Sequence, residues 1–238
     1  MANILLLETA TDNCSAAIAE NGRVLALAEV PQLANPASRL TLLIQDLVQQ
    51  TGIPLSRLDA VALSRGPGSY TSLRVGASVA KGICYALDKP LIAVDTLQAL
   101  AWGSRAAGTA ADMPPVFVPM LDARRQEVWT ALYDVSLQEQ VPAQPLILLN
   151  NLFYEFLENT ALAHPGTVFV VAGNGAIKTE NVPLPENVVL SEVRNCSALH
   201  LAELAEDFFQ KSDFQSVSYF EPFYMKQPNI TTPNKPGL

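Results

Sequence analysis

Residues 66–76 read GPGSYTSLRVG, and this stretch decides the fold class because it joins a short apolar strand to a long helix. The apolar run at 60–63 predicts the strand, and residues 71–87 are predicted to form the helix. Pro67 fixes one backbone angle, and the glycines on either side of it permit conformations that are closed to other residues. A strand that turns sharply into a helix is typical of α/β proteins.

The turn itself allows two physical interpretations. Ser69 or Thr71 is expected to cap the helix by accepting a hydrogen bond from an exposed backbone N–H. The N–H groups of such a turn point toward one place, so it is either a phosphate-binding loop or an ordinary capped turn. It is not a Walker A loop, because no Lys-Ser or Lys-Thr pair follows the second glycine. The motif residues singled out are Gly66, Pro67, Gly68, Ser69, Thr71 and Arg74.

Strand and helix patterns extend from this turn toward the start of the chain. Residues 4–7 form a fully apolar run, which predicts a central buried strand. Asn21-Gly22 separates the runs at 14–19 and 23–30, and this dipeptide between apolar runs predicts a hairpin. Apolar residues at helical spacing then predict a helix at 37–50, with Gly just past its end.

The chain is expected to consist of two halves. A stretch rich in Gly, Ala, Thr and Pro at 108–115 marks the boundary between them. Strands predicted at 116–121 and 126–134 begin the second half as strands began the first. We therefore predict an α/β chain with subdomains at residues 1–107 and 108–238.

Composition excludes several classes of protein. Hydrophobic residues make up 49% of the chain and charged residues 16%, which excludes a disordered chain. The net charge of −8 argues against a free-standing nucleic-acid binder. The chain shows neither a signal-peptide pattern nor an apolar run of membrane-spanning length, so we expect a cytoplasmic protein. Three widely separated cysteines predict free thiols in place of a disulfide framework or a zinc site: Cys14, Cys84 and Cys196.

The helix predicted at 71–87 contains many small residues, and its only charged residues are Arg74 and Lys81. Each glycine inside a helix costs roughly 1 kcal/mol relative to alanine, which makes sense where another backbone approaches closely. The helix should therefore be covered on both sides, by tight packing inside the monomer or by a subunit interface shared with the helix at 37–50. The residues expected at such an interface are Leu40, Leu43, Ile44, Leu47, Leu73, Gly76, Ala77, Ala80, Lys81 and Cys84.

Several motifs in order resemble one known family. GPGSYTSLRVG is similar to the GPGSFTGLRIG signature of the TsaB family, also called YeaZ. The segments LETAT, CS and VDTL, then LDARRQEVW at 121–129 and EPFYMK at 221–226, resemble further family motifs. The resemblance covers nearly the whole chain and is strongest up to about residue 135. Its motif residues in the second half are Asp122, Arg124 and Glu127.

The resemblance implies an actin/hexokinase/Hsp70-like fold with two ribonuclease-H-like halves. It also implies a non-catalytic scaffold or activator subunit in the modification of tRNA adenosine to threonylcarbamoyladenosine. Such a subunit binds the catalytic TsaD through the two helices of its first half, acts with the ATPase TsaE, and contacts tRNA only indirectly. It self-associates as a homodimer through the same surface. No cofactor is assigned to the chain, and ATP or ADP at the subunit interface of the complex stays open.

Three departures from the related families stand out. Residues 35–41 contain no histidine, where TsaD relatives carry an HxxxH metal motif. The first strand ends in Glu8-Thr9, where kinases of the superfold carry an aspartate followed by glycine-bearing phosphate contacts. Ser72 stands where the family signature has glycine.

Candidate catalytic groups are few. The two histidines, His164 and His200, lie beside no nucleophile motif, and the serines near the turn lack a GxSxG elbow. Asp122 and Glu127 flank two arginines, so a salt-bridged turn is expected, with partner or nucleic-acid contact by the arginines as the alternative. Residues 173–175, Gly-Asn-Gly, resemble an adenosine-binding loop only weakly. The alternative function is an ATP-dependent small-molecule kinase of the same superfold, although its phosphate-binding residues are missing after the first strand.

Overall fold

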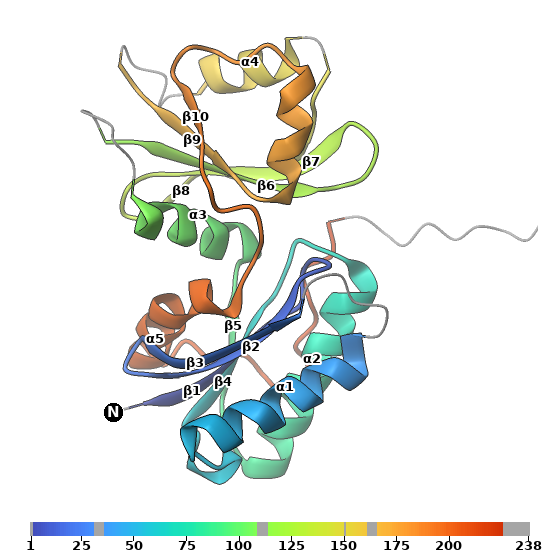
Figure 1. Ribbon diagram of the computed structural model, residues 1–238, viewed down its shortest axis with the longest axis vertical. Coiled ribbons are helices and arrows are strands. Elements are labelled where there is room, and N and C mark those ends of the chain that lie inside the picture. The colour runs from blue at the N-terminus through green and yellow to red at the C-terminus, as the bar shows by residue number, and fades with distance from the viewer. Residues whose placement is uncertain (1, 31–35, 109–113, 150, 161–165, 226–238) are drawn as a thin grey trace, which may run out of the picture.

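Two five-stranded mixed sheets, each carrying helices, make up the chain in the computed structural model (Figure 1). The strand order is β3-β2-β1-β4-β5 in the first sheet and β10-β9-β6-β7-β8 in the second. Each half places its first strand at the centre, with an antiparallel hairpin on one side and parallel strands on the other. This repetition confirms the predicted α/β class with two similar halves. The structure describes residues 2–30, 36–108, 114–149, 151–160 and 166–225.

The first sheet contains the predicted hairpin. Asn21 and Gly22 have φ angles of 50° and 76°, as the central residues of a type I′ turn require. Side chains along the first strand alternate between two buried faces, with Leu5 and Leu7 on one side and Leu6 on the other. The strands of this sheet are β1 (Asn3–Glu8), β2 (Cys14–Glu20), β3 (Arg23–Val30), β4 (Ala60–Ser64) and β5 (Leu91–Val94).

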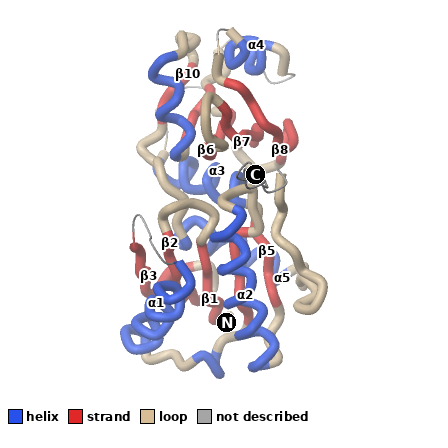
Figure 2. The backbone as a smooth tube through the Cα atoms, turned by 90° about the vertical axis from the view of Figure 1, so that its right-hand side faces the viewer, coloured by secondary structure: helices blue, strands red, loops and turns tan. Residues whose placement is uncertain are grey.

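Helices α1 (Pro36–Thr51) and α2 (Tyr70–Leu87) lie side by side over one face of this sheet (Figure 2). Gly52 follows α1 with a φ of 69°, in agreement with the predicted helix end. The apolar stripe predicted for α1 packs into the core between the helices and the sheet. That core contains Leu5, Leu7, Leu40, Leu47, Leu63, Ala80 and Cys84.

Each sheet is also covered by a helix from the opposite half of the sequence. Helix α5 (Ala202–Gln210), preceded by the 3₁₀ helix η3 (Ala198–Leu201), packs on the second face of the first sheet. Helix α3 (Thr96–Ala107) joins the core of the second sheet. The subdomains at 1–107 and 108–238 stay a prediction, and the two halves exchange these helices.

The second sheet could be predicted only in part. Sequence reasoning missed β8, an edge strand whose Pro142 and Pro145 weaken the strand pattern. It also missed α4, because seven residues are too few for a clear helical period. The elements of this half are β6 (Val116–Asp122), β7 (Glu127–Tyr133), β8 (Glu139–Ile147), α4 (Leu152–Glu158), β9 (Phe169–Ala172), η2 (Asn174–Asn181) and β10 (Val188–Leu190).

The last described residues, 213–225, form a C-terminal strap along the first half. The Gln215 N–H donates to a carbonyl of β5 at 2.8 Å. Phe220 is 9% exposed and enters the core that α2 covers. The Lys81 ammonium donates to the carbonyl oxygens of Ser218 and Phe220 at 3.2 and 3.1 Å. The strap therefore ties α2 to the edge of the sheet.

Candidate partner-binding site

The turn before α2 is held by hydrogen bonds from three other parts of the chain. The Gly66 N–H donates to Thr96 Oγ1 at 3.1 Å, and the Ser69 N–H donates to Ala10 O at 2.7 Å. The strap donates its Phe223 N–H to the carbonyl of the residue before the turn at 2.7 Å. Two N–H groups that could have held an anion are therefore already bonded within the chain.

Close approach by other segments explains three glycines of the motif. A Cβ at Gly66 would lie 2.5 Å from a carbonyl oxygen of the strap, and one at Gly68 would collide with the Ala10 carbonyl. A Cβ at Gly76 would collide with the Thr9 hydroxyl. Gly66 also has a φ of 115°, which side chains with a Cβ rarely adopt. The motif is thus a packing junction between the loop after β1, the turn and the strap.

The predicted side-chain cap of α2 is wrong. Ser69 is the N-cap residue, but its side chain accepts no hydrogen bond from the helix backbone. Its hydroxyl accepts a bond from the Ser72 hydroxyl at 3.1 Å instead. Thr71 lies inside the helix and is exposed, so it does not cap either. The backbone of Ser69, held by Ala10, positions the start of the helix.

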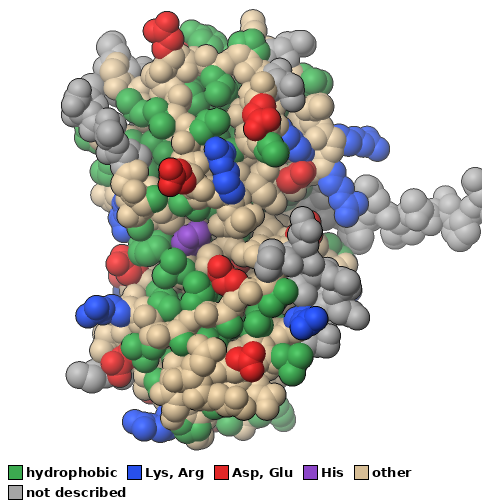
Figure 3. All heavy atoms as spheres, in the orientation of Figure 1, with side chains coloured by type: hydrophobic (Ala, Val, Ile, Leu, Met, Phe, Trp, Pro, Cys, Tyr) green, Lys and Arg blue, Asp and Glu red, His purple; other side chains and the backbone are tan. Residues whose placement is uncertain are grey.

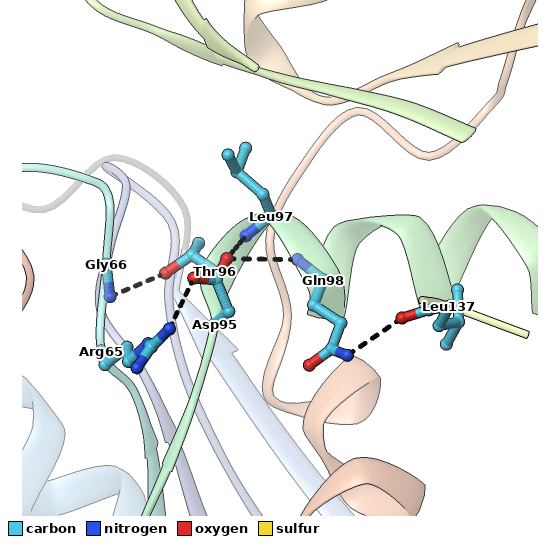
Figure 4. A network of polar contacts seen from close by, with 7 residues as sticks. All are labelled: Arg65, Gly66, Asp95, Thr96, Leu97, Gln98 and Leu137. Atoms are coloured by element: carbon cyan, nitrogen blue, oxygen red, sulfur yellow. Dashed lines mark hydrogen bonds and ion pairs between the residues drawn. The ribbon is translucent and has the colours of Figure 1, made fainter. Parts of the chain in front are cut away.

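Asp95 caps α3 and links it to the strand before the turn (Figure 4). Its carboxylate accepts from the N–H groups of Leu97 and Gln98 at 2.9 and 3.4 Å, and pairs with the Arg65 guanidinium at 3.4 Å. Burial raises the pKa of Asp95, and the charge of Arg65 opposes this effect. The Gln98 side chain donates to Leu137 O at 3.2 Å, so the network connects the two sheets.

The residues expected at a partner interface come together, but inside this chain. Lys81 is half-buried and bonded to the strap, and the others are buried in or beneath the two helices. Packing inside the monomer, the first of the two interpretations, accounts for their burial, so a partner would have to contact other residues of α1 and α2. The buried residues are Leu40, Leu43, Ile44, Leu47, Leu73, Gly76, Ala77, Ala80 and Cys84.

The outward face of α2 consists mostly of small residues, with Tyr85 among them, whereas the outward face of α1 is polar apart from Leu42. Leu42 on α1 and Tyr85 on α2 are 49% and 86% exposed. Gly82 is exposed, and a Cβ there would meet nothing within 4 Å, so no contact among the described residues accounts for a glycine. A hollow of about 330 Å³ on α2 is lined by Tyr70, Thr71, Arg74, Val75, Ser78 and Val79.

Glu8 is a fully buried acid at the end of β1. Its Oε1 accepts from the Ala10 N–H at 2.6 Å and from the Ser64 hydroxyl at 2.8 Å, while Oε2 has no partner among the described residues. Burial raises the pKa of Glu8 to about 7. Because Ala10 in turn accepts from Ser69, the carboxyl group supports the turn that leads into α2.

The predicted turn at 122–127 is confirmed, but its ion pair differs from expectation. Asp122 Oδ1 accepts from the Arg124 N–H at 2.6 Å and from the Lys178 ammonium at 2.5 Å. The ion pair therefore forms with a lysine of η2, and not with a neighbouring arginine. The Lys178 ammonium also donates to the Glu127 carbonyl at 2.8 Å. Arg124 and Arg125 are exposed at the tip of the turn, with φ angles of 69° and 52°.

The Gly-Asn-Gly segment at 173–175 packs against this turn. Asn174 Oδ1 accepts from the Asp122 N–H at 2.9 Å. A Cβ at Gly175 would lie 2.9 Å from the backbone of Leu121, and one at Gly173 would collide with the Met120 carbonyl. Both glycines are thus explained by close packing of η2 on β6, without a nucleotide.

The described histidine, His200, and the three cysteines are all buried. His200 is 8% exposed and packs so closely on α3 that a Cβ at Gly103 would lie 2.8 Å from its ring. Burial lowers its pKa to about 4, so the ring is neutral near pH 7. His164 lies outside the described residues. The predicted free thiols are confirmed, since Cys14, Cys84 and Cys196 are buried and unpaired.

The described residues contain neither a helix suited to crossing a membrane nor a cluster of side chains suited to a metal ion. Across the described ranges, no helix combines the length and the apolar character that crossing a membrane requires. Nor do the described histidine, cysteine, aspartate and glutamate side chains form a group of three or more suited to a metal ion.

Comparison with known proteins identifies relatives along nearly the whole chain. The family model described as TsaD, tRNA N6-adenosine threonylcarbamoyltransferase, matches residues 29–233. The tRNA threonylcarbamoyladenosine biosynthesis protein TsaB of Escherichia coli is 27% identical, over 98% of both chains. The TsaB protein of Haemophilus influenzae is 26% identical, over 98% of this chain and 97% of the relative.

Solved structures agree with the fold. YeaZ from Pseudomonas aeruginosa superposes with a TM-score of 0.76 at 27% identity, covering 94% of this chain and all of the other. The inorganic polyphosphate/ATP-glucomannokinase of an Arthrobacter strain superposes with a TM-score of 0.53 over 88% of this chain. At 13% identity this second likeness concerns the fold alone, and it confirms the expected actin/hexokinase/Hsp70-like class.

Proposed function

Because this chain belongs to the TsaB (YeaZ) family and carries the TsaD family domain over residues 29–233, we propose that it is a non-catalytic subunit that binds a TsaD-like catalytic subunit. The subunit acts in tRNA threonylcarbamoyladenosine biosynthesis in the cytoplasm, together with a TsaE-like ATPase. It supports the partner that transfers the threonylcarbamoyl group, and it pairs with a second copy of itself through the same surface.

The observation that carries the proposal is the outward face of α1 and α2. Gly82 costs helix stability there, yet no described residue approaches it. Tyr85 and Leu42 expose large apolar side chains on the same two helices. Exposed aromatic and aliphatic side chains around small residues suit a helix-to-helix contact with another subunit.

The turn at residues 66–69 supports a non-catalytic role. Its Gly66 and Ser69 N–H groups are bonded to Thr96 and Ala10, so protein groups occupy positions that a phosphate oxygen would need. The net charge of the chain is −8, and in Figure 3 the basic side chains that gather at one edge of the second half have acidic side chains beside them. This distribution favours tRNA contact through the partner, because nucleic-acid binding relies on clustered positive charge.

Co-purification with the TsaD-like protein of the same cells tests the proposal, and Gly82→Arg is the informative variant. The residue is exposed, and a Cβ there meets no described atom within 4 Å, so we expect arginine to leave the fold intact while blocking close helix approach. Substitutions at Gly76 or Ala80, by contrast, would disrupt the core of the monomer. Ala106→Arg, on the exposed end of α3, is the matched control. We expect Gly82→Arg to abolish both pairing and self-association; a folded variant that pairs normally contradicts the proposed surface.

The rival kinase function is tested separately by calorimetric titration of the isolated chain with ATP and magnesium. The scaffold proposal expects no turnover under these conditions. Tight binding accompanied by ATP turnover would overturn it.

A further inference from the structure

Arg74 is an exposed cation whose position is set before any partner arrives. Its guanidinium lies 5.5 Å from the centre of the Tyr70 ring and donates to the Tyr70 hydroxyl at 3.3 Å. The Tyr70 ring lies 4.6 Å from the ring of Tyr224, which belongs to the C-terminal strap. The strap therefore anchors a stack of two rings and a guanidinium, and such preorganisation lowers the entropy cost of binding.

The charge of Arg74 has no ion-pair partner among the described residues. Helix α2 contains no acidic residue, and its other cation, Lys81, is bonded to carbonyls of the strap. Glu221 acts electrostatically on Tyr224 but forms no ion pair with Arg74. The sequence segments 31–38 and 226–238 contain no Asp or Glu. The face of α2 is thus locally positive on a chain whose net charge is −8.

The hollow beside the guanidinium combines apolar walls with hydroxyl groups. Val75 and Val79 are one helical turn apart and line it together with Thr71 and Ser78. The Ser78 hydroxyl donates to the Arg74 carbonyl at 2.8 Å, so its proton is already bonded within the helix. An apolar side chain of a partner fits such a hollow, while a charged side chain is suited to its rim at Arg74.

We propose that Arg74 binds a carboxylate on a helix of the TsaD-like partner, and that an apolar side chain one turn away on that helix fills the hollow at Val75 and Val79. The inference rests on the proposed function, because it states the chemistry of the partner at the surface proposed there. Helices that pack on each other bring residues one turn apart against a matching pair on the facing helix. A nucleic-acid phosphate is the competing anion, and the apolar walls favour the protein carboxylate.

Calorimetric titration of the purified chain with its TsaD-like partner tests the inference. We expect Arg74→Glu to weaken binding by about tenfold or more, since it places a negative charge against the carboxylate. Arg74→Gln, which removes the positive charge but adds no negative one, should weaken binding less and should flatten the dependence of affinity on salt. Arg57→Glu makes the same charge change at an exposed site off the two helices, and its affinity should match that of the wild type.

The outcomes separate the two proposals. If the wild type does not bind the TsaD-like protein, the proposed function fails. If the wild type binds and folded Arg74→Glu binds equally well, the proposed function stands and the carboxylate inference is overturned. Restoration of Arg74→Glu binding by a Glu→Arg or Asp→Arg change on a partner helix supports the inference. Loss of tRNA binding by Arg74→Glu with unchanged partner affinity would assign the site to a phosphate and overturn it.

Discussion

Two buried groups, Glu8 and His200, make the free energy of unfolding respond to pH in opposite directions. Burial raises the pKa of Glu8 from 4.5 to about 7 and lowers the pKa of His200 from 6.5 to about 4. Between pH 4.5 and 6.5 the folded chain keeps a proton on Glu8 that the unfolded chain has lost. Over the same interval the unfolded chain carries a proton on His200 that the folded chain excludes.

The sign of each contribution follows from these protons. Glu8 favours the folded state most below pH 4.5, and its contribution is lost as pH rises toward 7. The contribution of His200 is complete above pH 6.5 and is lost as pH falls toward 4. Each group alone changes the free energy of unfolding by ~1.4 kcal/mol per pH unit where its folded and unfolded states differ by one proton. The two slopes therefore nearly cancel in the wild type between pH 4.5 and 6.5.

The contributions of Glu8 and His200 are separated by measuring the free energy of unfolding of Glu8→Gln and His200→Gln in urea, between pH 4.5 and 7.5 at constant ionic strength. Glutamine keeps an acceptor for Ala10 and Ser64 at position 8, so folding is retained. On acidification from pH 6.5 to 4.5, Glu8→Gln should lose ~2 kcal/mol relative to the wild type, and His200→Gln should gain ~2 kcal/mol. A loss of packing changes the free energy of unfolding by the same amount at every pH, so it leaves the slope of the pH profile unchanged. Profiles parallel to that of the wild type in both variants would refute the reasoning.

Substitutions at four positions probe packing and capping. Gly68→Ala should lower the free energy of unfolding by ~3 kcal/mol, because its Cβ meets the backbone of Ala10, whereas Gly82→Ala should raise it by up to ~1 kcal/mol; equal effects in urea titrations would contradict the close-approach account. Asp95→Ala should lower the melting temperature of the chain through a loss of ~1–2 kcal/mol, and Asp95→Asn should lose less because asparagine also caps helices; identical melts would count against the cap. Phe220→Ala should cost ~3 kcal/mol by leaving a cavity under α2, and an unchanged urea midpoint would show that the strap contributes little.

Elements with local causes could be predicted from the sequence. Asn21-Gly22 specifies its turn through the two positive φ angles that it adopts. Pro36 and Gly52 delimit α1 through backbone preferences that need no tertiary partner. Edge strand β8 could not be predicted, because its prolines interrupt the alternation that marks a strand.

The orientation of α2 on the sheet is harder to predict from the sequence than the presence of the helix. Small and apolar residues lie almost all round this helix, so composition does not say which face meets the sheet. The spacing of Leu73, Ala77, Ala80 and Cys84 at steps of three and four was the available signal for the inward face. Tyr85 falls off that stripe and is exposed. Apolar character alone therefore does not distinguish the face of α2 that meets the sheet from a face that meets a partner.

Contacts between distant segments could not be read from the sequence. The Arg65 carbonyl accepts a hydrogen bond from the Phe223 N–H of the strap, about 160 residues further along the chain. No local sequence pattern predicts that pairing. Asp95, in contrast, stands before Thr96-Leu97-Gln98 as a helix cap does, and this signal was available. The glycines of the turn gave a misleading signal, because flexible backbone serves close packing as well as phosphate binding.

The exchange of helices between the halves has a consequence during translation. One face of the first sheet, with Ile4, Leu6 and Val94, is covered by η3 and α5, which are synthesised about 100 residues after β5. At roughly 5–20 residues per second, the ribosome takes on the order of ten seconds to supply that cover. During this time the nascent chain presents an apolar sheet surface of the kind that chaperones recognise. The N-terminal half is thus synthesised first, but its core is completed only after most of the C-terminal half has been made.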